Sequence, residues 1–307
     1  MTDAVIRAER LGYWYGPVLA LSDIDLAIGP GITGLLGPNG CGKTTFMRLM
    51  GGYLRPSAGR IAVLGRNPWN NPAIAGQIGV SPELDTIDAG ASGLEFVRFA
   101  AALKGIPRSR IREAAERAVE RVEGADFASR PIRTLSKGMR QRVKIAAAIA
   151  HDPRLLILDE PLTAVDPVMR GRLLDLIRSF AQEGRSVVIS SHVLFEIERL
   201  TSRIVVMHRG RLLADGTIRE IRDLISRHPH QIRVRTPRSR RLAAVLASDE
   251  ALERIEFEEG GVTFRTRCPN DSYARLTRLL ADEDFEVQEI SSPDDNLEAV
   301  FRYLTER

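Results

Sequence analysis

The strongest signal in this 307-residue chain is the segment Gly37-Pro38-Asn39-Gly40-Cys41-Gly42-Lys43-Thr44, which Thr45 continues. Its spacing matches G-x-x-x-x-G-K-[ST], a pattern in which successive backbone N–H groups point into one concavity at the electropositive start of a helix. In such a loop Lys43 gives a positive charge to the phosphates, and Thr44 gives a hydroxyl ligand to Mg²⁺. Glycines are needed because a Cβ would keep the backbone away from a phosphate. The segment therefore predicts a site for a nucleoside triphosphate with magnesium.

The residues on either side of this loop favour the same interpretation. Residues 31–36 form an apolar run typical of a short buried strand, and residues 46–50 begin a helical pattern. The order strand, loop, helix is the context that a phosphate-binding loop requires. The alternative, a plain glycine-rich turn, does not require it.

Composition excludes some classes of protein. The chain is 44% hydrophobic and 27% charged, as is usual for a globular protein. It contains no run of 18 apolar residues, and residues 1–7 lack the apolar core of a signal peptide, so we expect a cytoplasmic protein that does not itself span the membrane. Cys41 and Cys268 are the only cysteines, and since Cys41 lies in the phosphate loop we expect no structural disulfide.

The net charge of +4 is a weak signal for a partner, because 40 of the 44 basic residues are arginine and they alternate with acidic residues along the chain. We therefore expect no nucleic-acid partner. The densest basic run, residues 233–241, predicts a solvated strand edge followed by a helix start, and an anionic surface such as lipid headgroups or nucleic acid is the alternative.

Two domains are predicted, residues 1–222 and residues 223–307. In the first, short apolar runs alternate with amphipathic stretches, which favours an α/β domain whose parallel strands are covered on both faces. The segments expected as strands are 154–158, 186–190 and 203–207, and those expected as helices are 108–122, 143–150 and 168–182.

The pattern changes after Gly216. We expect strands at 231–236, 253–258, 261–267 and 284–290, and helices at 238–248, 272–282 and 296–305. The order β-α-β-β-α-β predicts a small α+β accessory domain that is ferredoxin-like.

Two adjacent acids, Asp159 and Glu160, end the apolar run 154–158. In a fold with a phosphate loop, Mg²⁺ is met by a carboxylate at the carboxyl end of a buried strand, so Asp159 is the expected magnesium ligand. Glu160 is the expected general base on the attacking water, or the group that polarises it. The alternative role of the pair is to cap a helix.

Residues 4–220 resemble the ATP-binding subunits of ABC transporters, because further motifs of that family follow in the family's order. These are Leu135-Ser136-Lys137-Gly138-Met139 at the LSGGQ signature, Asp159-Glu160 at the Walker B end, Ala164-Val165-Asp166 at the D-loop, Ser191-His192 at the switch histidine, and Tyr13-Trp14-Tyr15-Gly16 at the adenine-stacking loop. The resemblance implies a P-loop NTPase fold with a RecA-like core, an antiparallel β subdomain and a helical subdomain. It also implies an ATPase that forms ADP and phosphate and couples this reaction to transmembrane transport.

The resemblance implies roles for individual residues as well. Two copies would sandwich two ATP molecules, with Ser136 and the Gly138 backbone completing the γ-phosphate shell of the opposite subunit. His192 would hold the γ-phosphate and the attacking water in line, and Asp166 would link the two active sites. Tyr15 is the expected adenine-stacking residue, with Trp14 or Tyr13, or packing of Tyr15 in the core, as alternatives.

The chain departs from the family pattern at two motifs. The signature has Lys137 where a glycine is usual and Met139 where a glutamine is usual; Lys137 either helps to hold ATP or points to solvent. Within residues 77–84, Glu83 stands where the family has the Q-loop glutamine. A carboxylate there still reaches Mg²⁺ or its water, so we expect Glu83 to be a metal ligand that couples the nucleotide state to the membrane partner.

Glu83, the trailing residues 220–307 and the tail 295–301 resemble the export-type subfamily. This implies a homodimer or heterodimer of ATP-binding subunits at the cytoplasmic face of the cell membrane, working with separately encoded permease subunits. The permease is expected to contact residues 84–105, where the candidates for exposed apolar residues are Phe96, Val97 and Phe99, and core packing is the alternative.

The competing class is an ABC-type ATPase without a transport role, either a translation factor or a DNA-associated protein. One ATPase domain instead of two argues against the translation factors, and the lack of sustained heptads argues against the DNA-associated proteins. A regulator of a membrane complex or a cofactor-assembly transporter would use the same chemistry, and the sequence leaves both open.

Overall fold

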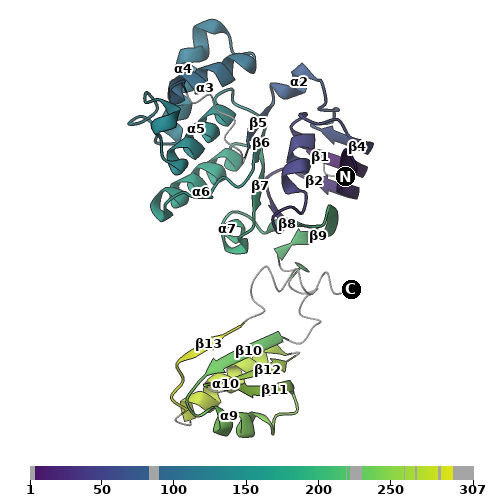
Figure 1. Cartoon of the computed structure of the whole chain (residues 1–307), viewed down its shortest axis with the longest axis vertical. Coiled ribbons are helices and arrows are strands. Elements are labelled where there is room, and N and C mark those ends of the chain that lie inside the picture. Colours follow the sequence, from purple (N-terminus) through teal and green to yellow (C-terminus); the bar gives the residue numbers. More distant parts are fainter. Residues whose placement is uncertain are drawn as a thin grey trace. The chain divides into compact units, whose positions relative to one another are not determined.

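The chain divides into two compact units, residues 1–218 and 219–307. The structure is a computed structural model (Figure 1), and it describes residues 4–82, 90–218, 220–221, 230–258, 260–266, 268–282 and 285–292. The predicted domain boundary between residues 222 and 223 lies outside the described residues. Within them, no helix is long and apolar enough to cross a lipid bilayer.

A six-stranded mixed sheet forms the centre of the first unit. Its strands are β3 (Ile32–Leu36), β5 (Ile78–Ser81), β6 (Leu155–Leu158), β7 (Ser186–Ser191), β8 (Arg203–His208) and β9 (Arg211–Thr217), in the order β5-β6-β7-β3-β8-β9. The neighbours from β5 to β8 pair in parallel, and β9 is antiparallel to β8. Every residue of β6 and β7 is buried, because helices and a second sheet cover both faces.

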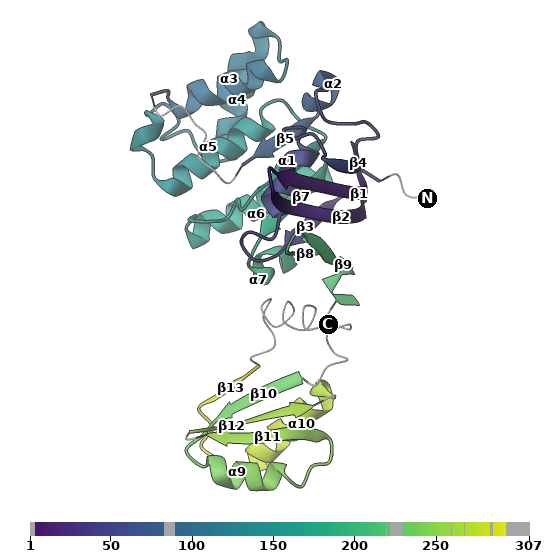
Figure 2. The ribbon, with the colours of Figure 1, turned by 45° about the vertical axis from the view of Figure 1, so that its right-hand side comes forward.

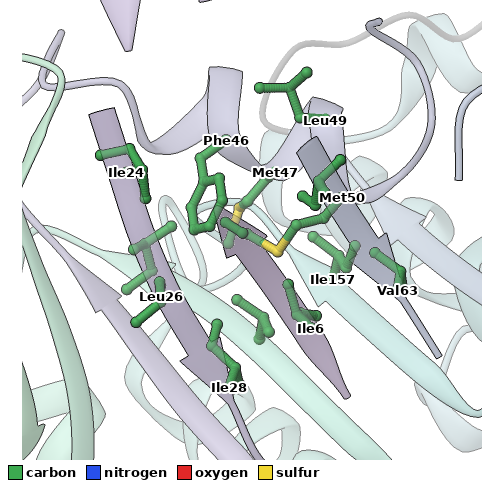
Figure 3. Close-up of a cluster of buried hydrophobic side chains, with 14 of the residues drawn as sticks. Ile6, Ile24, Leu26, Ile28, Phe46, Met47, Leu49, Met50, Val63 and Ile157 are labelled. Atoms are coloured by element: carbon green, nitrogen blue, oxygen red, sulfur yellow. The ribbon is translucent and has the colours of Figure 1, made fainter. Parts of the chain in front are cut away.

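The second sheet of this unit is antiparallel. It consists of β1 (Ile6–Tyr15), β2 (Val18–Ile28) and β4 (Ala58–Val63) in the order β2-β1-β4. Helix α1 (Lys43–Met50) packs between the two sheets, so that Phe46 and Met50 share one buried cluster with Ile6 of β1 and Ile157 of β6 (Figure 3). This burial fixes the start of α1, and with it the phosphate loop, against both sheets.

Further α-helices described in the first unit are α2 (Pro72–Ala75), α3 (Gly93–Leu103), α4 (Arg108–Arg121), α5 (Lys137–Ile149), α6 (Pro167–Gln182) and α7 (Leu194–Glu198). Helices α3, α4 and α5 pack against one another, and they lie together in Figure 2. Val97 on α3 is fully buried in this group, so of the two possibilities stated for it, core packing is correct and exposure is not. Phe99 is 61% exposed, and Leu103, four residues further on the same helix, is 70% exposed.

The second unit has the element order β10 (His230–Arg235), α9 (Ser239–Leu246), β11 (Leu252–Glu258), β12 (Gly261–Thr266), α10 (Pro269–Asp282) and β13 (Glu289–Ser291). Its sheet has the order β11-β12-β10-β13, and all neighbours are antiparallel. Leu242 and Leu246 of α9 and Leu276 of α10 pack on Val234 and Phe264, so that both helices cover the same face of the sheet (Figure 2).

Two expectations for this unit need correction. Strand β13 begins at Glu289 instead of residue 284, because the buried Phe285 precedes it without regular secondary structure. Strand β10 lies between β12 and β13, so the basic run 233–241 does not begin on a sheet edge. Its arginines 233 and 235 are exposed because they alternate with buried residues. The predicted helix over 296–305 lies outside the described residues.

Candidate nucleotide-binding site

The glycine-rich loop forms the turn from β3 into α1. Gly42 precedes the helix with a φ of 107°, which side chains rarely adopt, and a Cβ there would come 2.7 Å from the side chain of Leu21. A Cβ on Gly37 would come 2.4 Å from Cys41 Sγ and 2.6 Å from the carbonyl oxygen of Met207. Both positions therefore require glycine for this loop to form.

Cys41 anchors the middle of the loop. Its N–H donates to the Pro38 carbonyl at 3.2 Å, and its own carbonyl accepts from the N–H of Gly210 at 2.9 Å. Burial raises the pKa of the Cys41 thiol more than the nearby Lys43 lowers it, so the group packs as a small neutral side chain. Neither Cys41 nor Cys268 forms a disulfide.

Lys43 connects the loop to the paired acids. Its Nζ donates to the carbonyl of Gly37 at 2.6 Å and to that of Pro38 at 3.3 Å, and it lies 3.6 Å from Glu160 Oε1. Lys43 and Glu160 are both buried, so this positive charge acts in a site that little water enters.

A cavity of about 480 Å³ opens over the loop. Its lining consists of Tyr15, Val18, Leu19, Ala20, Asn39, Gly40, Gly42, Lys43, Thr44, Thr45 and Glu160. Of the three neighbouring aromatic residues, Tyr15 lines the cavity, Tyr13 packs against the core, and Trp14 is exposed elsewhere. The Tyr13 and Tyr15 rings meet edge to face with centroids 4.8 Å apart, which orients the Tyr15 ring at the cavity.

Asp159 and Glu160 follow β6 directly, and both are buried. Ser190, near the end of the adjacent strand β7, joins them: its Oγ donates to Asp159 Oδ1 at 2.7 Å and accepts from the Glu160 N–H at 2.8 Å. Ser190 is a site residue that no sequence motif predicted. The available signal was a hydroxyl at the carboxyl end of a buried strand, where side chains of neighbouring parallel strands meet.

Glu160 is held in an unusual conformation. Its φ is 48°, in the left-handed region that non-glycine residues seldom occupy. Its Oε2 lies 3.0 Å from His192 Nδ1, so that an N–H at this position donates to the carboxylate. Its Oε1 is buried and has no hydrogen-bond partner in the described part of the chain. A buried acceptor in this state is suited to a bound water or ligand that donates a proton.

The oxygen atoms of the site fit magnesium. Asp159 supplies a carboxylate and Thr44 a hydroxyl, which are hard ligands of the kind that Mg²⁺ prefers. Two protein ligands suit Mg²⁺, which usually binds through one or two protein groups together with phosphate oxygens and waters. The described residues contain no group of three or more His, Cys, Asp and Glu that could hold a metal ion. The third predicted ligand, Glu83, lies outside the described residues.

The other predicted residues form a second cluster. Ser136 caps α5, since its Oγ accepts from the Met139 N–H at 3.2 Å, and Asp166 caps α6, since its Oδ1 accepts from the Met169 N–H at 2.9 Å. Gly138 lies against residue 164, where a Cβ would come 3.1 Å from the carbonyl oxygen. None of these residues lines the cavity, and Lys137 between them is exposed.

A phosphate loop between β3 and α1, with paired acids at the end of a nearby parallel strand, defines a P-loop nucleoside triphosphatase. Comparisons identify the family. Residues 21–163 match the family model described as "ABC transporter". The chain is 32% identical over 306 residues to the daunorubicin/doxorubicin resistance ATP-binding protein DrrA of Streptomyces peucetius, covering 98% of this chain and 92% of the relative.

A second relative, the Nod factor export ATP-binding protein I of Cupriavidus metallidurans, is 33% identical, with coverage of 72% and 73%. A solved ATP-binding subunit of an ABC transporter superimposes with a TM-score of 0.66 at 26% identity, covering 72% of this chain and 93% of that one. The chain belongs to the ATP-binding proteins of ABC transporters, as the sequence motifs predicted. Its first unit has the fold of the ABC ATPases, with one mixed and one antiparallel sheet, and the activity of its family is ATP hydrolysis.

Proposed function

We propose that this protein binds ATP in the cavity over the glycine-rich loop, hydrolyses it with magnesium, and thereby drives a separate membrane permease that exports its substrate. The observation that carries the proposal is the position of the buried Glu160 between two nitrogen groups, the buried ammonium of Lys43 and the more exposed imidazole of His192. Residues 37–45 would hold the phosphates, and Tyr15 would stack on the adenine.

The same geometry supports specific chemical roles. Asp159 and Thr44 would hold Mg²⁺, which neutralises developing charge on the β- and γ-phosphates when it is bound. Glu160 would accept a proton from the attacking water while the bond between the γ-phosphorus and the ADP oxygen breaks. Because His192 Nδ1 is engaged with Glu160, its Nε2 is the ring nitrogen left for the γ-phosphate.

We infer that the second cluster serves a second copy of the chain or a close relative. Ser136, Lys137, Gly138 and Asp166 do not line the cavity of their own chain, and Ser136 caps a helix whose N-terminus favours anions. In a head-to-tail pair these groups would complete the γ-phosphate shell of the partner, and Lys137 would add a positive charge there.

The test is ATP-driven pairing. In Glu160→Gln, which loses the base and keeps the shape, ATP with magnesium should convert monomers to dimers with the natural companion subunit, as measured by light scattering after size exclusion. Adding Ser136→Glu to this variant should abolish pairing and leave ATP binding within about twofold, because the new charge faces only the partner's phosphate. A Glu160→Gln protein that binds ATP and never pairs would refute the proposal.

Export is inferred from the relatives, whose names state drug resistance and Nod factor export, one of them aligned over 98% of this chain. We propose the cytoplasmic face of the membrane as the location and Phe99 and Leu103 of α3 as part of the permease contact, because both are exposed and apolar. Glu83 would couple the nucleotide state of the site to the membrane permease. Unchanged ATPase and transport rates in Glu83→Ala would remove that role.

We propose that the second unit is a separate accessory domain of ferredoxin-like type. The order β-α-β-β-α-β, the strand order β11-β12-β10-β13 and the two helices on one face support this assignment. Its own buried cluster around Phe264 and Phe285 supports independent folding, which urea denaturation of residues 219–307 alone would test.

A further inference from the structure

Two of the four lysines in this chain hold the two ends of one short strand. Lys104, after α3, donates from Nζ to the carbonyls of Ala75 at 2.8 Å and Ile78 at 2.9 Å. Lys144, on α5, donates from Nζ to the Pro82 carbonyl at 2.9 Å. Strand β5 runs between these contacts. A compact ammonium group suits such narrow carbonyl pockets better than a planar guanidinium does, although the chain otherwise uses arginine.

Helix α5 and the turn that follows it contact β5 from its start to its end. Lys144 and Ala148 are four residues apart on one face of α5, and His151 lies in the turn that follows the helix. Lys144 contacts Pro82 at the end of the strand, and His151 Nε2 lies 3.2 Å from the Ile78 carbonyl at its start. In the middle, a Cβ on Gly79 would come 2.1 Å from the Ala148 carbonyl, so this glycine is what allows the close approach.

Strand β5 is in turn hydrogen-bonded to β6 and to the main chain of the first of the paired acids. It pairs in parallel with β6, with Ser81 opposite Leu158. The N–H of Asp159 then donates to the Ser81 carbonyl at 2.9 Å. The Ser81 carbonyl, which accepts from the Asp159 N–H, and the Pro82 carbonyl, which accepts from Lys144 Nζ, belong to consecutive residues.

We propose that Lys144 is a positioning residue for Asp159: it fixes the Ser81–Pro82 end of β5 on α5, and this end fixes the main chain from which the Asp159 carboxylate projects. Lys144 does not line the nucleotide cavity, so it acts through β5. The functional part of the proposal rests on the proposed role of Asp159 as a magnesium ligand. Ser136 caps the same helix, so one rigid element carries both the predicted contact to a partner's ATP and the support of the metal carboxylate.

The test compares Lys144→Met with Lys104→Met in the full-length protein. Both substitutions remove an ammonium group that holds β5, and only Lys144 contacts the end beside Asp159. In Lys144→Met, hydrogen exchange of the Asp159 amide should accelerate about tenfold, as expected for the loss of one charge-assisted hydrogen bond that supports it. The Mg²⁺ concentration that gives half-maximal ATP hydrolysis should rise about tenfold, and KM for ATP should stay within about twofold.

In Lys104→Met, the exchange of the Asp159 amide and the magnesium requirement should stay within about twofold of the wild type. Equal values for the two variants would overturn the proposal, because Lys144 would then only stabilise the fold. If Lys144→Met does not fold, Lys144→Gln carries the same comparison, since it keeps an N–H donor on a shorter side chain. A wild-type protein that hydrolyses ATP without a divalent cation would refute the role of Asp159 as a magnesium ligand. The hydrogen-exchange comparison would then test by itself whether Lys144 fixes the main chain of Asp159.

Discussion

Ser190→Ala tests whether one hydroxyl holds the two acids of the site in place. The Ser190 side chain is fully buried, donates to Asp159 Oδ1 at 2.7 Å and accepts from the Glu160 N–H at 2.8 Å. Alanine leaves both groups buried without this partner, and one of them is a carboxylate. Each such loss costs about 1 to 3 kcal/mol, and since the two share one site we expect a decrease of about 3 kcal/mol in the free energy of unfolding.

The assay is thermal unfolding followed by tryptophan fluorescence, because Trp14 and Trp69 are the only tryptophans and both lie in the first unit. A loss of about 3 kcal/mol lowers the midpoint by about 6 to 12 °C in a unit of this size. The control is Thr33→Val in β3, a neighbour of β7, since Thr33 Oγ1 is buried without a hydrogen-bond partner in the described residues. Removing an unpaired hydroxyl should change stability by less than about 1 kcal/mol. If the two variants lose the same stability, the hydrogen bonds of Ser190 do not hold the acids.

Three further predictions concern other parts of the same unit. Gly37→Ala should lower the unfolding free energy by about 2 kcal/mol and weaken ATP binding, measured by urea denaturation and calorimetry, because its Cβ would meet Cys41 Sγ and the Met207 carbonyl; wild-type stability would contradict the geometry. Burial, and then the charge of Lys104, lower the pKa of His151 from 6.5 to about 4. The unfolded state therefore takes up a proton first, and stability present above pH 6.5 should fall by about 3 kcal/mol as the pH drops to 4. His151→Gln should lack this part of the acid dependence, and an identical pH profile would disprove it. Tyr15→Ala should weaken ATP binding about tenfold, whereas Tyr15→Phe should not, since stacking needs only the ring; equal affinities measured with a fluorescent ATP analogue would count against stacking.

The sequence was sufficient to predict the elements of the site that carry fixed spacing. The glycine-rich loop and the paired acids after an apolar run were found because each has a motif whose chemistry restricts its residues. Ser190 has no such motif, since a serine at the end of a buried strand is common and its partner is 31 residues away. Only the pairing of β6 with β7 brings them together.

The features of the fold that the sequence left open or predicted wrongly have similar causes. Val97 and Phe99 are two residues apart on an apolar helix, and only the packing of α3 on α4 and α5 determines that the first is buried and the second exposed. The internal position of β10 depends on β13, which is 54 residues further along the chain and three residues long. Neither kind of information is present in local periodicity.

The lysine distribution also has a practical consequence for labelling chemistry. Lys43, Lys104 and Lys144 bind backbone carbonyls, and among the four lysines only Lys137 is exposed. At a pH where the α-amino group is left protonated or is blocked beforehand, Lys137 is therefore the one lysine side chain that an amine-reactive dye should modify in the folded protein. It would place a fluorophore at the first turn of α5, where quenching on addition of nucleotide would report contact with a second molecule.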